Sequence, residues 1–193
     1  MSRCFAWVVF LLVLTLAGCA TTQAPVLPHE AGRNDFSLTG RVLVRQAERA
    51  DVLRVTWQHF SVSDRVRLET LLGQTVAELE LGPDRAYARL GDGRVLQSSD
   101  DASLAQELLG TPLPLRRFAN WVRAKPGHDT DEVVRDQTQR VLAMRDLDWR
   151  LSYTGYGDLI DTPSRPAQVE ARNGDIMVRL RIEAWTEGSS GNE

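Results

Sequence analysis

The sequence predicts an α+β domain that is mainly β, with helices set against one curved antiparallel sheet. Three observations predict this fold. From Phe36 onward most segments alternate apolar and polar residues with a period of two, as strands with one buried and one solvated face do. Such clean alternation favours antiparallel pairing. A central stretch has the spacing of helices instead, and turn residues separate the strands.

The segment before the domain predicts export and lipidation. Arg3 gives it a positive start, an apolar run extends from Phe5 to Leu16, and small residues precede Cys19. These features are those of a secretory signal peptide over residues 1–18, ending as a bacterial lipobox does. Cys19 is therefore the expected mature N-terminus and lipid attachment site. The alternative is an uncleaved signal anchor, which is disfavoured because the run has only 12 residues, whereas a membrane-spanning helix needs about 20.

Residues 19–34 combine prolines, small polar residues and no periodicity, so we expect a lipidated N-terminus followed by a flexible tether. Ala20, and not Asp, follows the cysteine, which is compatible with sorting to the outer membrane of a Gram-negative bacterium. One domain is expected over residues 35–187, followed by a disordered tail over residues 188–193. The chain left after cleavage is long enough for a single domain with a proper core, and we expect a monomer.

Five strands are recognisable by their alternation, three in the first half of the chain and two near its end. They are residues 53–58, 65–69, 76–81, 149–153 and 176–183. Turn residues at 91–93 and 173–175 lie where hairpins would reverse the chain. The second turn offers the pair Asn173-Gly174, which is suited to positive φ.

Two helices are predicted between the strand groups. Ser99, Asp100 or Asp101 is the expected cap of the first, and Gly110 its end, around an apolar stripe of Leu104, Ala105, Leu108 and Leu109. A second, short helix stops at residues 125–127 and carries Leu115, Phe118, Ala119, Trp121 and Val122. A sheet with such a helical insert encloses either a filled core or a covered cavity, and periodicity does not distinguish the two.

The charge pattern argues against a nucleic-acid partner. The formal net charge is −3 and the arginines are interleaved with acidic residues along the sequence, whereas nucleic-acid binding depends on clustered positive charge.

The two cysteines are Cys4, which is lost with the leader, and Cys19, which is acylated. No disulfide, thiol nucleophile or zinc cluster is therefore expected in the mature chain.

No catalytic constellation is recognisable in the sequence. The three histidines, His29, His59 and His128, lack the spacing of a metal site, and there is neither a nucleophile elbow nor a phosphate-binding glycine loop. The carboxylate pairs Asp100-Asp101 and Asp146-Asp148 are assigned to a helix start and to a turn before a strand. We therefore expect a non-enzymatic protein without a metal or other cofactor.

The order and spacing of several short motifs behind the lipobox resemble those of the LolB family. The motifs are Leu38-Thr39-Gly40-Arg41, Trp57, the strand–loop–strand from Arg65 to Leu81, Pro112-Leu113-Pro114-Leu115 followed by Trp121, the segment from Trp149 to Tyr156, and a last strand ending at Trp185. The resemblance implies an open, strongly curved antiparallel half-barrel whose helices cover the mouth of an apolar cavity.

The resemblance also implies a function. Proteins of this family accept triacylated lipoproteins from the periplasmic carrier LolA and insert them into the inner leaflet of the outer membrane, without an energy source of their own. This chain would then be a lipid-anchored receptor on the periplasmic face of the outer membrane, and its partners would be LolA, triacylated lipoproteins and outer-membrane phospholipid.

Candidate cavity residues lie on the apolar strand face, although each of them is also compatible with ordinary core. They are Leu53, Val55, Trp57, Val66, Leu68, Leu79, Trp149, Leu151, Tyr153, Val178, Leu180 and Ile182. Phe118 and Trp121 are expected in a helical lid over the opening, so that entry of lipid would move them.

The candidate membrane-insertion loop is Thr70-Leu71-Leu72-Gly73. In the family this loop projects an apolar residue that drives delivery into the membrane, and Leu72 matches that residue by its place before glycine. The family often has proline where this chain has Leu71, which makes the tip more apolar and less rigid. Without the resemblance, the two leucines would be expected to fold back into the core.

Two other functions compete with the lipid-transfer receptor. A non-catalytic structural or assembly lipoprotein would use the curved sheet to bind a protein partner, and a packed core without a cavity would favour it. A lipid hydrolase is the third hypothesis, and it would require turnover of an ester.

Overall fold

The computed structural model describes residues 34–188. Residues 31–193 form one compact unit by themselves, and all of the described residues belong to it. The predicted signal peptide, the lipidation site Cys19 and the predicted tether up to residue 33 lie outside the described residues, as does the predicted tail from residue 189 onward.

Strands dominate this domain, and short helices interrupt them once. The strands are β1 (Phe36–Gln46), β2 (Arg49–Phe60), β3 (Ser63–Glu69), β4 (Thr75–Leu81), β5 (Ala86–Leu90), β6 (Val95–Ser98), β7 (Thr130–Arg135), β8 (Val141–Asp146), β9 (Trp149–Thr154), β10 (Gln168–Asn173) and β11 (Ile176–Glu187). The helices between β6 and β7 are α2 (Asp101–Leu109), the 3₁₀ turn η2 (Leu115–Arg117) and α3 (Phe118–Trp121).

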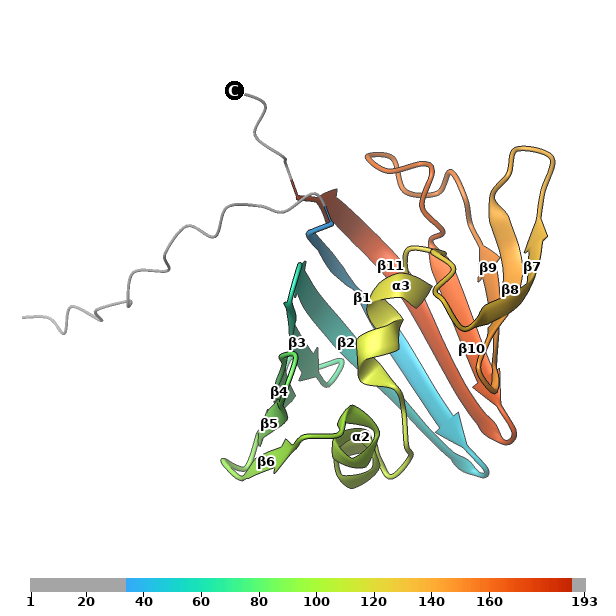
Figure 1. Cartoon of the computed structure of the whole chain (residues 1–193). Helices are drawn as coiled ribbons and strands as arrows, with labels where there is room; N and C mark the ends of the chain where they lie inside the picture. Colours follow the sequence, from blue (N-terminus) through green and yellow to red (C-terminus); the bar gives the residue numbers. More distant parts are fainter. Residues whose placement is uncertain (1–33, 189–193) are drawn as a thin grey trace, which may run out of the picture. The chain divides into compact units, whose positions relative to one another are not determined.

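All eleven strands form one antiparallel sheet in the order β6-β5-β4-β3-β2-β1-β11-β10-β9-β8-β7. The sheet curls strongly, so that β3 to β6 and β7 to β9 form two walls, with α2 and α3 on the concave side between them (Figure 1). The predicted class, a mainly β, curved and open antiparallel sheet with covering helices, is confirmed.

The first and last strands lie together at the centre of the sheet, because β1 pairs with both β2 and β11. The register of β1 with β11 shifts between Thr39 and Gly40. At this bulge a Cβ on Gly40 would lie 2.2 Å from the carbonyl oxygen of Arg181, so only glycine allows the two backbones to approach this closely. The glycine of the Leu-Thr-Gly-Arg motif thus helps to bend the centre of the sheet.

The helical prediction is confirmed for the first helix. Asp100 caps α2 by accepting hydrogen bonds from the backbone N–H groups of Ala102 and Ser103, and Gly110 follows the last turn as its C-cap. The predicted second helix is shorter than a regular one, because it divides into η2 and the single turn α3. Both elements lie across the concave face of the sheet.

Alternation did not reveal every strand. β7 is an edge strand whose side chains are mostly exposed, so it carries little apolar pattern. The β10–β11 hairpin is present where it was predicted, but its loop is Gly174-Asp175, since Asn173 pairs with Ile176. Of the predicted Asn173-Gly174 pair, only the glycine has positive φ.

The core of the domain divides into two clusters along the concave face. One contains Phe36, Trp57 and Trp185 with the apolar residues of β2 to β5, and the other contains Trp121 and Trp149 with those of β8 to β10. A few residues that are only partly buried pack against both clusters, namely Val42, Leu109, Leu115 and Phe118. The space between the clusters is where a cavity can form.

Candidate functional site: an apolar pocket under a helical lid

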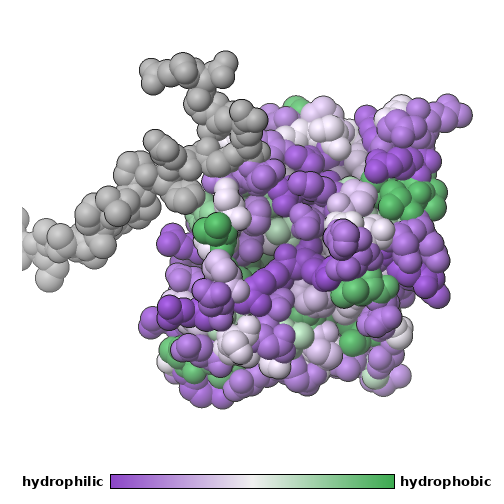
Figure 2. Space-filling view, in the orientation of Figure 1, coloured by the Kyte–Doolittle hydropathy of each residue, from purple (hydrophilic) through white to green (hydrophobic). Residues whose placement is uncertain are grey.

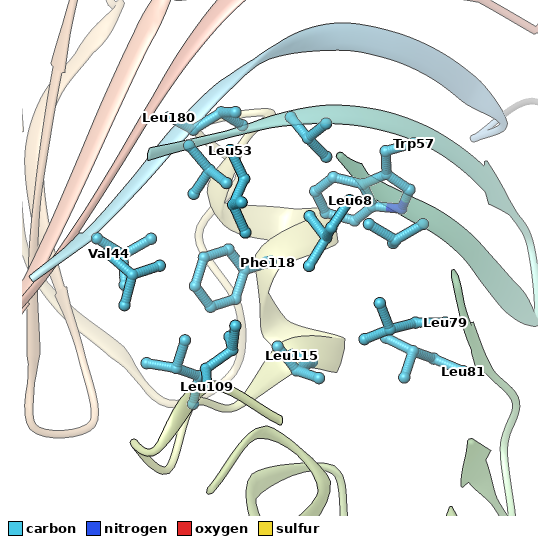
Figure 3. A pocket seen from close by; sticks show the side chains of 15 residues that line it. Val44, Leu53, Trp57, Leu68, Leu79, Leu81, Leu109, Leu115, Phe118 and Leu180 are labelled. Atoms are coloured by element: carbon cyan, nitrogen blue, oxygen red, sulfur yellow. The ribbon is translucent and has the colours of Figure 1, made fainter. Parts of the chain in front are cut away.

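An apolar pocket of about 90 Å³ lies between the two core clusters, on the concave face of the sheet. The lining side chains are all apolar apart from the indole N–H of Trp57, and come from β1 to β4, from β11 and from the helical segment: Val42, Val44, Leu53, Val55, Trp57, Val66, Leu68, Leu79, Leu81, Leu109, Leu113, Leu115, Phe118, Val178 and Leu180. The elements η2 and α3, residues 115–121, form the lid of this pocket. Their side chains Leu115 and Phe118 face Leu53, Leu68 and Leu180 of the sheet (Figure 3). Such a surface suits hydrocarbon and offers no charge to a polar ligand.

Most of the predicted cavity residues meet in this pocket. Nine of the candidates line it, namely Leu53, Val55, Trp57, Val66, Leu68, Leu79, Phe118, Val178 and Leu180. The prediction missed six further lining residues, which are Val42, Val44, Leu81, Leu109, Leu113 and Leu115. Three of these were recognisable, because Leu81 continues a predicted strand and Leu109 and Leu115 belong to the predicted helices.

Five of the candidates do not line this pocket. Trp121, Trp149, Leu151 and Tyr153 are buried in the second cluster, and Ile182 is buried in the first. For the four residues of the second cluster, the reason is the way the β8–β10 wall is filled. Trp121 inserts against it, with its ring centroid 5.5 Å from that of Trp149, so this part of the inner face is solid core.

Two consecutive arginines hold the lid segment against opposite walls. Arg116 donates through Nη1 to Asp101 of α2 at 3.1 Å and through Nε to the carbonyl oxygen of Gly82 after β4. Arg117 donates through Nη1 to Asp146 of β8 at 2.8 Å and through Nη2 to Asp129 at 2.7 Å.

The Asp146 carboxylate is almost fully buried and also accepts a hydrogen bond from the indole N–H of Trp121. The pKa of Arg117 is raised above its ordinary value, mainly because it donates to Asp129, with the negative charge of Asp146 adding to the effect. Three of the four paired carboxylates of the sequence thus have structural partners, because Asp100 caps α2 and Asp101 binds Arg116.

One end of the pocket is closed by an aromatic and polar cluster. Trp57 lines the pocket with its ring and donates its indole N–H outward to Asp64 at 2.8 Å. Asp64 is buried and also bonds to Nδ1 of His59 at 2.7 Å, and the ring of Phe36 stacks on that histidine. The polar atom of the indole is therefore satisfied outside the pocket, and the lining stays apolar.

The loop between β3 and β4 places both leucines in solvent. The Leu72 side chain is 92% exposed and that of Leu71 is 50% exposed. Gly73 donates to the carbonyl oxygen of Thr70, and Thr70 donates to that of Gln74, which together close a three-residue hairpin loop. Gly73 has φ +85°, the left-handed conformation that ends such a loop. The turn therefore holds Leu71 and Leu72 at its tip without burying them.

The surface around the lid is mainly hydrophilic, and its hydrophobic residues form small separate groups (Figure 2). In residues 34–188, no three histidine, cysteine, aspartate or glutamate side chains are grouped to hold a metal ion. No helix of this part of the chain is long and apolar enough to cross a membrane.

The comparisons with known proteins agree with this geometry. The family model described as outer membrane lipoprotein LolB matches residues 34–185. The outer-membrane lipoprotein LolB of Dechloromonas aromatica (strain RCB) is 34% identical over 92% of this chain and 97% of its own length. That of Azoarcus sp. (strain BH72) is 31% identical over 88% of this chain and 89% of its own length.

Solved structures with little sequence identity share the fold. A LolA superfamily protein from Nitrosomonas europaea superposes with a TM-score of 0.51 at 9% identity, covering 81% of this chain and 87% of that protein. An outer membrane lipoprotein-sorting protein domain described as putative, from Vibrio parahaemolyticus, superposes with a TM-score of 0.53 at 15% identity, covering 84% and 88%. Fold, pocket and sequence agree, and the chain belongs to the LolB family of outer-membrane lipoproteins.

Proposed function

We propose that this chain, as an outer-membrane lipoprotein receptor in lipoprotein localisation, accepts the acyl chains of triacylated lipoproteins from LolA and delivers them to the inner leaflet of the outer membrane. The observation that carries the proposal is the all-apolar pocket beneath a lid that is fastened by side-chain ion pairs. Cys19 would carry the lipid anchor that keeps the domain at the periplasmic face of that membrane. Neither the pocket nor the family favours the alternative of a structural or assembly lipoprotein.

The energetic problem that the pocket would solve is exposure of acyl chains to water. Each methylene buried is worth about 0.8 kcal/mol, so one acyl chain of about 16 carbons loses on the order of 12 kcal/mol when it is exposed. A triacylated protein therefore does not diffuse freely through an aqueous space. Transfer requires that the chains move from one apolar cavity into another and then into the bilayer.

In this proposal the lid moves when cargo enters, and the small size of the pocket supports such a movement. Its volume is about 90 Å³, whereas pockets that enclose a drug-sized ligand have roughly 300 to 1,000 Å³, and three acyl chains are larger still. Phe118 is only partly buried between the two clusters, so it can leave its place at a smaller cost than a fully buried residue. The described conformation would then be the closed, unloaded one.

Leu71 and Leu72 would supply the contact with the bilayer. Full burial of a leucine side chain is worth about 1.5 to 3 kcal/mol, and the 92% exposure of Leu72 means that almost all of this remains available to lipid. The two leucines together contribute a few kcal/mol of partition free energy. This partition free energy makes transfer to the membrane more favourable, but it is too small to replace the lipid anchor.

The experiment is delivery of a labelled triacylated lipoprotein from LolA, through the receptor, into phospholipid vesicles. Leu72→Glu is expected to leave folding and uptake of the label intact while stopping its insertion into the vesicles. The matched control is Ile160→Glu, because Ile160 is also 92% exposed but lies in a loop far along the chain from the leucine pair. Normal insertion by Leu72→Glu, or equal loss in both variants, would show that the loop assignment is wrong.

A further inference from the structure

Arginines are concentrated on the outer, convex face of the sheet. They come from strands that are distant from one another in the sequence, so the sequence alone does not show this cluster. Because side chains alternate between faces, the neighbours of pocket-lining residues point away from the pocket. Arg41 precedes Val42, Arg54 follows Leu53 and Arg181 follows Leu180, and all three arginines are exposed. The outward positions of β9, β10, β11, β1 and β2 carry two glutamates, Glu170 and Glu183, and seven arginines, Arg41, Arg45, Arg54, Arg150, Arg172, Arg179 and Arg181.

The strand register places like charges directly opposite one another in two rows. Arg41 on β1 lies opposite both Arg181 on β11 and Arg54 on β2. In the second row, Arg150 on β9 lies opposite both Arg145 on β8 and Arg172 on β10. Like charges in directly opposite positions destabilise a sheet. The fold alone gives no reason for these two rows.

Carboxylates neutralise only part of this face. Glu183 binds Arg41 at 2.9 Å, and Glu170 binds Arg172 at 2.6 Å and Arg179 at 2.7 Å. Within residues 34–188, no carboxylate forms an ion pair with Arg45, Arg54, Arg150 or Arg181. A face with uncompensated positive charge therefore exists on a chain whose formal net charge is −3.

The first arginine row ends beside the candidate membrane-insertion loop, residues 70–73, which we call the leucine loop. Arg54 lies opposite Glu69, the last residue of β3, and the loop begins at the next residue. Between the two rows, a third row places the apolar side chains of Leu43 and Val52 opposite each other, and Val52 is exposed. Exposed apolar residues beside arginines are the composition of surfaces that bind the headgroup region of anionic membranes. An acidic protein partner would account for the arginines but not for the adjoining leucine tip.

We propose that the convex face formed by Arg41, Arg54 and Arg181, with Arg45 and Arg150 beside them, binds anionic phospholipid headgroups while the leucine loop enters the bilayer. The inference rests on the proposed role of that loop at the membrane. Anionic lipid would then orient the receptor, because contact along this face brings Leu72 to the bilayer surface. Repulsion within the two like-charge rows lowers the stability of the sheet, and this loss is the cost of having that binding face.

The test uses the unlipidated chain, residues 20–193, which contains the whole compact unit, after cooperative thermal unfolding has been verified for each variant. Binding is measured by co-sedimentation with vesicles of phosphatidylcholine alone and with vesicles containing about a third phosphatidylglycerol. Each arginine near an anionic surface is worth about fivefold in affinity, so Arg54→Gln with Arg181→Gln is expected to weaken binding to the anionic vesicles about 25-fold. Its melting temperature is expected to stay the same or to rise, because a like-charge row is relieved.

The matched control is Arg85→Gln with Arg89→Gln, which makes the same change in net charge at two exposed arginines next to and on β5, neither of which belongs to the two arginine rows. It is expected to bind the anionic vesicles like the parent chain. Equal binding of the parent chain to both kinds of vesicle, or equal losses in the two double variants, would overturn the proposal. Unchanged vesicle binding with impaired uptake from LolA would also overturn it and assign the face to an acidic protein. Failure of the parent chain to accept label from LolA would count against the receptor function alone.

Discussion

Replacing Arg117 by methionine separates the two demands that the proposed function makes on the lid, which are closure of the pocket and opening for cargo. Methionine keeps an unbranched apolar stem and removes the guanidinium, so Asp146 loses one of its two donors and retains the indole of Trp121. The second ion pair of Arg117, with Asp129, is exposed and contributes at most about 1 kcal/mol. The effect therefore depends mainly on Asp146.

The magnitude follows from the burial of the two partners. Removing one partner of a fully buried ion pair costs about 3 to 5 kcal/mol. The side chain of Asp146 is 4% exposed, but that of Arg117 is 32% exposed, so water already screens the pair and the expected cost falls to about 2 kcal/mol. For a domain of this size, that lowers the melting temperature by roughly 4 to 8 °C.

The same loss is expected to accelerate loading. In the proposed opening, the lid would separate from β8 and this ion pair would break, so about 2 kcal/mol taken from the closed state would make opening up to about 30-fold more favourable. The assay is the rate at which label moves from LolA to the receptor, together with thermal unfolding. Arg94→Met is the control, because its ion pair with Asp92 is exposed and lies in the turn between β5 and β6. A lower melting temperature with an unchanged loading rate would refute the role of Arg117 as a lid fastener.

Two further predictions concern stability. Tyr153→Phe is expected to leave the free energy of unfolding unchanged or to raise it by about 1 kcal/mol, because this buried hydroxyl has no hydrogen-bond partner among the described residues and burial raises its pKa; a clear loss in denaturant melts would show that the hydroxyl is engaged. Burial acts to raise the pKa of Glu170, but hydrogen bonds from Arg179 and Arg172 outweigh it and leave the pKa below the ordinary 4.5. The folded state therefore binds fewer protons than the unfolded state, so the contribution of Glu170 is present above about pH 4.5 and is lost as the pH falls through the lower, folded pKa. Glu170→Gln is expected to reduce this acid-dependent loss in melting curves between pH 6 and pH 3, and an unchanged slope would contradict it.

The strand pattern predicted the inner face of the sheet but not the boundaries of the pocket. Alternation determines which side chains share a face, and for that reason Leu53, Val55 and Trp57 were placed correctly on the concave side. The same alternation in Trp149, Leu151 and Tyr153 gave the same expectation. The two groups differ because Trp121, which comes from a distant segment, fills one wall, and a period of two contains no information about it.

The distribution of charge on the sheet could not be predicted from the sequence either. Along the sequence, arginine and acidic residues alternate closely enough to suggest an evenly charged surface. Register then places Arg41, Arg54 and Arg181 in one row, although Arg181 is distant from the other two in sequence. The loop was more predictable, because the hairpin places Leu71 and Leu72 between paired strands, and Gly73 marks the end of the turn. Its exposure was expected only through the family resemblance.

The most direct test of the receptor function is the acceptance step itself. Residues 20–193 are mixed with LolA that carries a triacylated lipoprotein labelled on its protein part, the two proteins are separated, and the label is measured on each. We predict that the label moves to the receptor without an energy source and remains there until vesicles are added. Label that stays on a competent carrier in the presence of a folded domain would contradict the receptor function. The residues that line the pocket would then be ordinary core.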